Sequence, residues 1–337
     1  MTAFATPADF LAALGDLPSP DTAARVAATA RQGQLTKPPG SLGRLEDIAV
    51  FFAGWQARER PAITQGRAVI FAGNHGVVTR GVSAFPAAVT AQMVANFAAG
   101  GAAINALAAA AGLTLEVVPI ALDHPTADFT QAPAMTAQEC LDALNIGAAA
   151  IAADTDLLVL GEMGIGNSTA AAALCAASFG GDIAGWVGPG TGIDAEGIAR
   201  KVATVAAGLA THAGHLSDPF EILRRLGGRE IAAIAGAVLA ARHRRIPVVL
   251  DGFICSSAIA PLAAAHPGIV DHCLAGHCST EPGHGRLLEQ LGLEPLLRLD
   301  LRLGEGSGAA VAVGVIRAAL LAHERMATFA EAGVAAG

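Results

Sequence analysis

A single glutamate lies between two glycines near the end of the chain. Residues 301–310 read LRLGEGSGAA, so Glu305 has glycine or apolar neighbours on both sides. Apolar surroundings disfavour the charged form of a carboxyl group and raise its pKa, which suits a general base near neutral pH. The bare backbone would let a flat ligand approach closely. Two interpretations follow: Glu305 removes a proton from a weakly acidic N–H of an aromatic substrate, or it occupies a surface turn.

A glycine-rich segment earlier in the chain has the pattern of an anion site. In GEMGIGNSTAAAAL, residues 161–174, a strand leads into a glycine loop and then an alanine-rich helix, which Asn167, Ser168 and Thr169 are expected to cap. The N-terminus of a helix attracts phosphate or carboxylate through its N–H groups and its dipole. The segment is neither a Walker A motif nor a G-x-G-x-x-G motif in the required register. The alternative is a well-capped tight turn.

A second glycine-rich segment, VGPGTGID at residues 187–194, precedes Lys201. The chain has 19 arginines but only two lysines, Lys37 and Lys201. Where lysine is scarce, a remaining lysine can have a role that the planar guanidinium of arginine does not fill. The segment therefore predicts a second backbone nest for an anion, with ordinary loop glycines and surface lysines as the alternative.

Histidines and cysteines cluster in DHCLAGHCSTEPGH, residues 271–284. The side chains that could bind zinc there are His272, Cys273, His277, Cys278 and His284. Their spacing matches no familiar zinc module, and adjacent residues of an extended segment point to opposite faces, so we expect no metal site.

The segment GNHGV, residues 73–77, places Asn74 and His75 at the end of a predicted strand. The histidine is either an acid or base or a hydrogen-bonded structural residue. A serine nucleophile is not expected either, because the chain has no G-x-S-x-G motif.

Five short apolar runs are predicted to be strands: residues 67–73, 115–121, 156–162, 246–252 and 269–276. Alanine-rich segments of helical length lie between them, which indicates an α/β fold with a Rossmann-like parallel sheet and helices on both faces. Most of these runs end in glycine followed by a polar residue. Because ligands of such sheets bind at the carboxyl ends of the strands, this pattern favours an enzyme.

Both ends of the chain are predicted to be helical and to form one small helical domain. The expected division is residues 1–60 with 308–337 for this domain and residues 61–307 for the Rossmann-like catalytic domain.

Composition excludes several other classes of protein. The net charge is −8 and no basic stretch contains interleaved aromatic residues, so nucleic-acid binding is not expected. Apolar runs are interrupted before the roughly 20 residues that cross a bilayer. The first residues have no basic segment typical of a signal peptide, and the five cysteines are an odd number scattered along the chain. We therefore expect a soluble cytoplasmic protein with reduced thiols.

Taken together, several segments resemble one family, the nicotinate-nucleotide–dimethylbenzimidazole phosphoribosyltransferases of cobalamin biosynthesis. The resemblance covers nearly the whole chain in the order KPPGSLGRLE (37–46), HGV (75–77), PAAVTAQM (86–93), GEMGIGNST (161–169), the glycine-rich stretch ending at Lys201, LDGF (250–253) and RLGEGSGAA (302–310). It implies transfer of the phosphoribosyl group of nicotinate mononucleotide to 5,6-dimethylbenzimidazole, giving α-ribazole 5′-phosphate and nicotinate. It also implies a homodimer and no metal or redox cofactor.

The resemblance assigns roles to individual residues. Glu305 takes the benzimidazole N–H proton while the other ring nitrogen attacks C1′. The residues placed around the mononucleotide and its phosphate are Glu162, Gly164, Gly166, Asn167, Ser168, Thr169 and Lys201. The residues placed in the base pocket are Phe85, Met93, Leu303 and Gly304.

The chain departs from the family pattern at two places. Phe85 and Met93 stand where some members offer a serine and a glutamine to the base, and Asn74 stands where some have aspartate. A more apolar pocket still suits the two methyl groups of dimethylbenzimidazole but changes which bases are tolerated. The alternatives are transfer to a phenol or purine-like base and a nucleotide-binding regulator without catalysis. A nicotinamide dehydrogenase is disfavoured because the G-x-G-x-x-G motif is missing.

Overall fold

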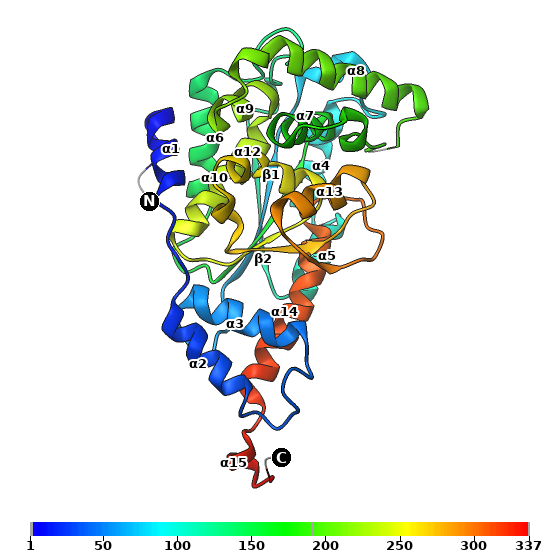
Figure 1. Ribbon diagram of the computed structural model, residues 1–337. Coiled ribbons are helices and arrows are strands. Elements are labelled where there is room, and N and C mark those ends of the chain that lie inside the picture. Colours follow the sequence, from blue (N-terminus) through cyan, green and yellow to red (C-terminus); the bar gives the residue numbers. More distant parts are fainter. Residues whose placement is uncertain (1–2, 191, 336–337) are drawn as a thin grey trace.

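The protein is an α/β fold with one six-stranded parallel sheet, described here from a computed structural model of residues 3–190 and 192–335 (Figure 1). The strands are β1 (Gly66–Ala72), β2 (Thr114–Pro119), β3 (Leu157–Met163), β4 (Val248–Leu250), β5 (Cys273–His277) and β6 (Pro295–Leu297). Their order in the sheet is β2-β1-β3-β4-β5-β6. The predicted parallel sheet with helices on both faces is confirmed.

The helices account for most of the remaining chain. The α-helices are α1 (Pro7–Gly15), α2 (Thr22–Gln32), α3 (Arg44–Gln56), α4 (Ala88–Ala98), α5 (Ala103–Ala110), α6 (Ala137–Ala149), α7 (Asn167–Phe179), α8 (Ala195–His212), α9 (Pro219–Leu226), α10 (Arg229–His243), α11 (Phe253–Ser257), α12 (Ala260–Ala265), α13 (Pro282–Leu291), α14 (Ser307–Arg325) and α15 (Phe329–Ala332). Four 3₁₀ segments are η1 (Gly76–Arg80), η2 (Ile183–Trp186), η3 (Ala213–His215) and η4 (Pro267–Val270).

Three sequence predictions about strands need correction. β6 was not predicted, because its three residues are too short to show a pattern. The run 246–252 forms a strand only at 248–250. The run 269–276 begins in a 3₁₀ turn, and its strand starts at Cys273.

Side chains alternate between the two faces of the sheet, as a pleated strand requires. On β1, Val69 and Phe71 enter the larger core, which the helices α6, α7 and α9–α12 complete. Ala68 and Ile70 point to the opposite face, where α3, α5 and α14 form a second core. The central strands are buried on both faces, and this fixes the direction in which their carboxyl ends point.

Residues near the two ends of the chain, in the segments 31–35 and 323–328, contact each other. Leu35 forms an antiparallel bridge with Thr328, and the guanidinium of Arg31 donates to the carbonyl oxygens of His323, Glu324 and Met326. In Figure 1, α2, α3, the end of α14 and α15 form the narrow lower part.

The first helix lies elsewhere. On α1, the ring of Phe10 packs at 6.2 Å from the ring of Phe220 in the larger core, so α1 does not join α2 and α3. α14 begins on the sheet and ends in the lower part. The domain boundaries at residues 60 and 308 stay predictions.

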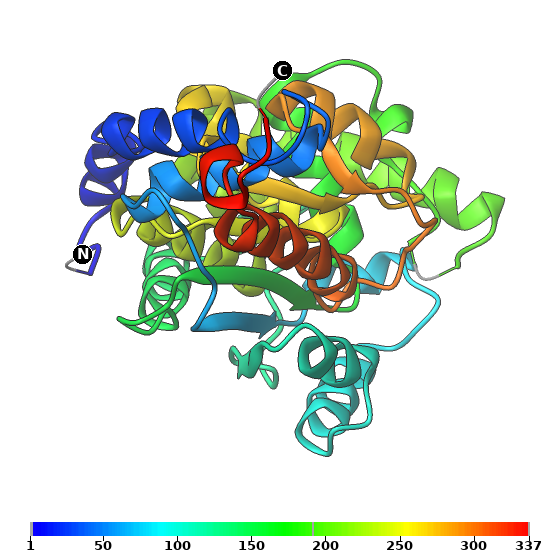
Figure 2. The ribbon, with the colours of Figure 1, turned by 90° about the horizontal axis from the view of Figure 1, so that it is seen from below.

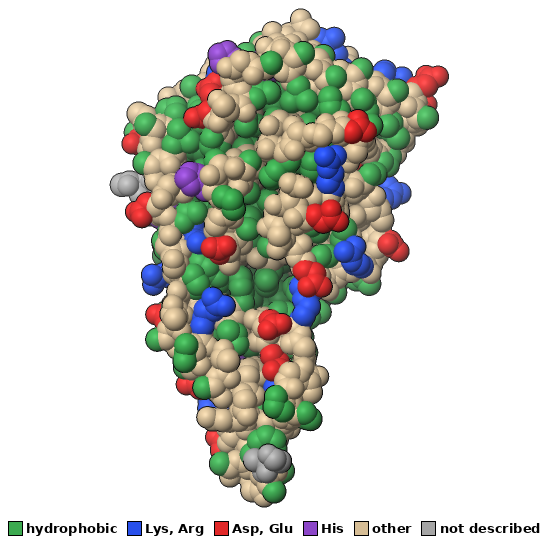
Figure 3. All heavy atoms as spheres, in the orientation of Figure 1, with side chains coloured by type: hydrophobic (Ala, Val, Ile, Leu, Met, Phe, Trp, Pro, Cys, Tyr) green, Lys and Arg blue, Asp and Glu red, His purple; other side chains and the backbone are tan. Residues whose placement is uncertain are grey.

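The face of the molecule shown in Figure 3 carries scattered charges. On the face shown in Figure 3, Lys and Arg side chains lie singly among Asp and Glu side chains. The described residues therefore form no continuous basic surface on this face.

Close helix packing gives a test of the fold. α6 and α10 approach each other at Gly147 and Gly236, where an added Cβ would overlap the backbone of Ala233 and of Leu144, respectively. Gly236→Ala should lower the free energy of unfolding by about 1–3 kcal/mol, because the helices must separate. Urea unfolding followed by circular dichroism measures it.

The matched control is Gly314→Ala in α14, where an added Cβ meets no atom within 4 Å. This change should raise the free energy of unfolding by about 0.5–1 kcal/mol, because alanine loses less conformational entropy than glycine in a helix. Equal effects of the two substitutions would contradict the packing argument.

Candidate active site

Polar residues follow four of the parallel strands at the same edge of the sheet. Asn74 and His75 follow β1, Glu162 lies at the end of β3, Asp251 follows β4 and His277 ends β5. The chain leaves β1 towards β2 on one side and returns to β3 on the other side, so β1 and β3 flank a topological switch point. Ligands of open α/β sheets bind at such a point, so the fold itself directs attention to this edge.

A cavity lies at this edge and brings together many of the residues singled out from the sequence. The predicted residues that line it are Glu162, Gly164, Asn167, Ser168, Leu303 and Gly304. The sequence assigned no role to its other polar side chains, which are His277, Ser279, Glu281 and Arg302. The signal available for His277 was its position at the carboxyl end of a predicted strand.

The glycine-rich loop turns sharply into α7. Gly166 is the N-cap of α7, with a φ of 93° that favours glycine. The expectation that Asn167, Ser168 and Thr169 cap this helix is therefore wrong, because they belong to its first turn and make no side-chain cap. The side-chain amide of Asn167 instead donates to the Glu162 carboxyl group. The positive end of the α7 dipole faces the cavity beside Ser168.

Lys201 joins the two glycine-rich segments. Its ammonium group donates to the Ser168 hydroxyl at 2.8 Å and to the Gly188 carbonyl at 3.0 Å. The side chain is almost fully buried, and burial lowers the pKa of Lys201 to about 8, although the nearby Glu281 carboxylate opposes this shift. Glu281 in turn accepts from the Gly190 N–H at 2.8 Å. Lys201 thus brings together the two glycine-rich segments that were predicted to be anion nests.

The chain's other lysine lies in a different place. The Lys37 ammonium lies 2.7 Å from the Glu46 carboxylate at the start of α3. The presence of a lysine at position 37 therefore has a structural explanation, since Lys37 forms an ion pair that is almost fully buried.

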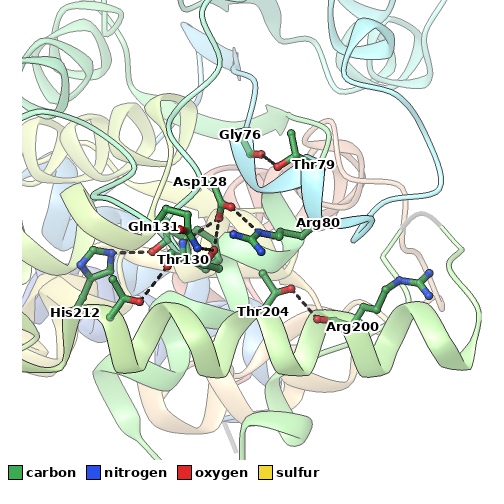
Figure 4. A network of polar contacts seen from close by, with 11 residues as sticks. Gly76, Thr79, Arg80, Asp128, Thr130, Gln131, Arg200, Thr204 and His212 are labelled. Atoms are coloured by element: carbon green, nitrogen blue, oxygen red, sulfur yellow. Dashed lines mark hydrogen bonds and ion pairs between the residues drawn. The ribbon is translucent and has the colours of Figure 1, made fainter.

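A polar network holds α8, and therefore Lys201, in place (Figure 4). The Asp128 carboxylate accepts from the Arg80 guanidinium at 2.6 Å and from the Thr130 hydroxyl at 2.8 Å. On α8, His212 contacts the Phe129 carbonyl at 2.8 Å. The network therefore links η1, which follows the His75 turn, with the helix that carries Lys201.

Glu305 occupies an unusual backbone turn. Its φ is 62°, between Gly304 at 85° and Gly306 at 82°, so three successive residues are left-handed. An added Cβ on Gly161 of β3 would lie 2.6 Å from the Gly306 nitrogen, which shows how closely the turn packs on the sheet. The Asp251 carboxylate accepts from the N–H of Gly306 at 3.2 Å and of Ala309 at 2.9 Å. Asp251 thus fixes the turn and the first residues of α14.

The Glu305 side chain is buried and has a carboxyl oxygen, Oε2, without a hydrogen-bond partner among the described residues. Burial raises the pKa of Glu305; the Ile104 backbone amide opposes this shift, and the Asp251 charge adds to it. The alternative of a surface turn is therefore wrong. Glu305 does not itself line the cavity, but its neighbour Gly304 does.

Glu162 shares this environment. Burial raises the pKa of Glu162 to about 8, with further contributions from the charges of Glu230, Asp251 and Glu305, and the hydrogen bond from Asn167 opposes the rise. An added Cβ on Gly304 would lie 2.5 Å from Glu162 Oε1. The backbone before Glu305 therefore packs directly on the Glu162 carboxyl group.

The predicted base pocket is only partly assembled around the cavity. Leu303 lines the cavity and is 59% exposed, whereas Phe85 is 47% exposed and does not line it. Met93 is half-buried and packs into the second core, the same core that contains Ile104 beside Glu305. Phe85 and Met93 therefore lie outside the cavity.

Three further predicted residues also lie outside the cavity lining. Gly166 is the N-cap of α7, Thr169 is inside its first turn, and Lys201 lies on α8 and reaches the lining residue Ser168. Among residues 3–190 and 192–335, no three His, Cys, Asp or Glu side chains are grouped so that they could hold a metal ion. His272 is buried against the Val238 carbonyl, and His284 accepts from the Ser279 N–H.

Known proteins provide a close comparison. Residues 17–334 match a family model described as phosphoribosyltransferase. The chain is 70% identical to the nicotinate-nucleotide–dimethylbenzimidazole phosphoribosyltransferase of Novosphingobium aromaticivorans over the full length of both. It is 57% identical to the protein of the same name from Sinorhizobium medicae, covering 97% of this chain and 96% of that one. The crystal structure of CobT from Thermus thermophilus superposes with a TM-score of 0.88 at 45% identity, covering 94% of this chain and all of that chain.

The buried state of Glu162 predicts a pH-dependent stability. Because its pKa is raised in the folded protein, the folded state holds a proton that the unfolded state loses above about pH 5. The free energy of unfolding should therefore fall between about pH 5 and pH 8. Glu162→Gln removes this dependence. The free energy of unfolding of the variant, relative to that of the unchanged protein, should therefore rise by more than about 1 kcal/mol from pH 5 to pH 8.

Urea unfolding at several pH values measures this difference. Glu196→Gln, on an exposed part of α8, is the control and should show no pH-dependent difference. A constant difference between the Glu162→Gln and unchanged proteins from pH 5 to pH 8 would show that Glu162 is ionised like an ordinary glutamate.

Proposed function

The chain belongs to the nicotinate-nucleotide–dimethylbenzimidazole phosphoribosyltransferase family, and from this premise we propose how its residues perform the reaction. The enzyme is a pentosyltransferase of cobalamin synthesis that transfers the phosphoribosyl group of nicotinate mononucleotide to 5,6-dimethylbenzimidazole. The products are α-ribazole 5′-phosphate and nicotinate. The observation that supports the proposed roles is the buried Glu305 carboxyl group, which has one oxygen without a partner among the described residues. It adjoins a cavity whose lining includes Ser168, the hydrogen-bond partner of Lys201.

The mononucleotide is proposed to bind along the glycine-rich loop. Its phosphate binds at the start of α7, where the Ser168 hydroxyl and the Lys201 ammonium lie 2.8 Å apart and the helix dipole favours an anion. Glu162, Asn167 and the backbone of Gly164 then face the ribose. Gly166 and Thr169 act indirectly, by setting the turn into α7 and its first residues.

Dimethylbenzimidazole is proposed to bind against Leu303 and Gly304, with Phe85 and Met93 closing the pocket on its outer side. Its methyl groups then contact apolar side chains. Glu305 accepts the N–H proton of the base as the other ring nitrogen forms a bond to C1′. The electron pair of the broken C1′–N bond passes to the nicotinate nitrogen, so nicotinate leaves without its ring charge. Attack opposite the leaving group converts the β-linkage into the α-linkage.

The chemistry at Glu305 is tested by replacing its carboxylate. Glu305→Gln should reduce kcat by roughly 10²–10⁴-fold, because the proton acceptor is lost, while binding of nicotinate mononucleotide is kept. Nicotinate release with dimethylbenzimidazole, followed by chromatography, measures turnover. The matched control, Glu196→Gln on the exposed face of α8, should behave as the unchanged enzyme. Near-normal turnover of Glu305→Gln would rule out the general-base role.

The same assay tests the proposed phosphate site separately from the proton transfer at Glu305. Lys201→Met keeps much of the side-chain volume, so it should fold, but it should raise KM for nicotinate mononucleotide about tenfold or more with a smaller change in kcat. An unchanged KM would remove Lys201 from the phosphate site. A panel of bases in the same assay tests the preference for dimethylbenzimidazole over phenols and purines.

We further propose that the enzyme is a cytoplasmic homodimer. The stretch Ala88–Ala110, containing α4 and α5, is apolar enough by composition to cross a membrane, and only 22% of its apolar window is buried within the chain. Figure 2 shows these two helices projecting from the body. A stretch with the same properties, Ser307–Arg325, is 56% buried and forms part of the second core. Contact with a second copy would cover the apolar surface of α4 and α5.

Light scattering after size-exclusion chromatography should give twice the 33.6 kDa mass of the chain. Ala95→Glu, on the exposed side of α4, should shift the mass towards that of one chain, whereas Ala12→Glu on α1 should not. A single-chain mass for the unchanged protein would contradict the dimer.

A further inference from the structure

One buried histidine–carboxyl pair at the edge of the sheet has no role in the reaction described so far. The His75 ring nitrogen Nε2 lies 2.5 Å from the Glu230 carboxyl oxygen Oε1, and both side chains are almost completely buried. His75 follows β1 in the segment GNHGV, and Glu230 lies in the first turn of α10. A carboxylate removed from water requires a compensating partner, and the imidazole supplies it.

Three glycines surround this pair. Any side chain at these positions would occupy the space that His75 and Glu230 fill. An added Cβ on Gly73 would lie 2.5 Å from Glu230 Oε2, and one on Gly164 would lie 2.7 Å from Glu230 Oε1. An added Cβ on Gly228 would overlap the His75 ring. The pair thus sits directly beneath the Gly164 backbone, which lines the mononucleotide cavity.

The Glu230 carboxyl group of the pair also interacts electrostatically with Glu162. Among the described groups, the charges that act on Glu162 come from Glu230, Asp251 and Glu305, and the Asn167 amide donates to it. Asp251 has its own partner, His277, with Nε2 to Oδ1 at 3.4 Å. Because the His75 ring nitrogen lies against Glu230, the pair presents less negative charge to Glu162 than Glu230 alone would.

We propose that His75 is a positioning residue of the transfer reaction: through its contact with Glu230, it supports the Gly164 loop and limits the negative charge that faces Glu162 in the mononucleotide site. The proposal rests on the proposed placement of the mononucleotide beside Glu162. His75 touches neither substrate and acts through Glu230.

The test is the pH profile of kcat/KM for nicotinate mononucleotide between pH 5.5 and 9.5. The proposal takes the charged form of Glu162 as the one that binds the ribose, so kcat/KM should have an acidic limb that follows the ionisation of Glu162. His75→Gln leaves Glu230 without its imidazole partner, so this limb should move up by about one pH unit, an approximately tenfold loss at a fixed pH on the limb. Glu230→Gln keeps a hydrogen-bond partner for His75 but removes the negative charge, so the limb should move down. In the double variant, His75→Gln with Glu230→Gln, the acidic limb should lie at a lower pH than in the single His75→Gln variant.

Two controls separate this role from a purely structural one. In a Glu162→Gln background, His75→Gln should no longer move the limb, because the group being shifted has been removed. A uniform loss of activity at all pH values in both single variants, with the limb unmoved, would overturn the proposal and leave the pair as packing only.

A readout without substrate distinguishes failure of this inference from failure of the proposed function. In the unchanged protein, Glu162 makes the free energy of unfolding fall as the pH rises. This fall should extend to higher pH in His75→Gln and should end at lower pH in Glu230→Gln. If these shifts occur but the profile of the reaction does not move, the pair sets the charge of Glu162 and the placement of the substrate is wrong. If they do not occur, the inference itself is wrong.

Discussion

The central constraint on this protein is that four carboxyl groups are buried at one edge of one sheet. Glu162, Glu230, Asp251 and Glu305 are all nearly inaccessible to water. Like charges so placed cannot all be ionised without partners. The structure resolves this by giving each a different environment: a histidine for Glu230, two backbone amides and a histidine for Asp251, and an amide for Glu162. Glu305 and Glu230 each keep one oxygen without a partner among the described residues, and of these two only Glu305 directly adjoins a residue of the cavity lining, its neighbour Gly304.

The backbone has to accommodate this crowding, and it does so by omitting side chains. Gly161 lets the turn around Glu305 rest on β3, and Gly304 leaves room for the Glu162 carboxyl group. Asp251 then joins the end of β4 to the start of α14, so the position of Glu305 is fixed by the sheet rather than by the loop alone. A reactive group on a strained turn needs such support, because left-handed backbone costs energy in residues other than glycine.

The sequence predicted the parts of this arrangement that leave a local pattern. The apolar runs that became β1 to β5, the glycine-rich loop and the isolated Glu305 all have signals within about 15 residues. The failures come from contacts between distant segments. Nothing near His75 indicates Glu230, which lies 155 positions later. The docking of α1 on α9 likewise depends on Phe10 meeting Phe220.

The late position of α14 has a consequence for how the protein is made. This helix covers one face of the sheet, contacting β3, β5 and α5, yet it is formed by residues 307–325 of 337. During synthesis from the N-terminus, β1 to β6 all leave the ribosome before the helix that completes their second core. The part of this apolar face that α14 covers therefore stays open until α14 emerges, and its native contacts of high sequence separation can close only then. Until then, the exposed apolar surface is open to non-native contacts that a core formed by neighbouring segments would avoid.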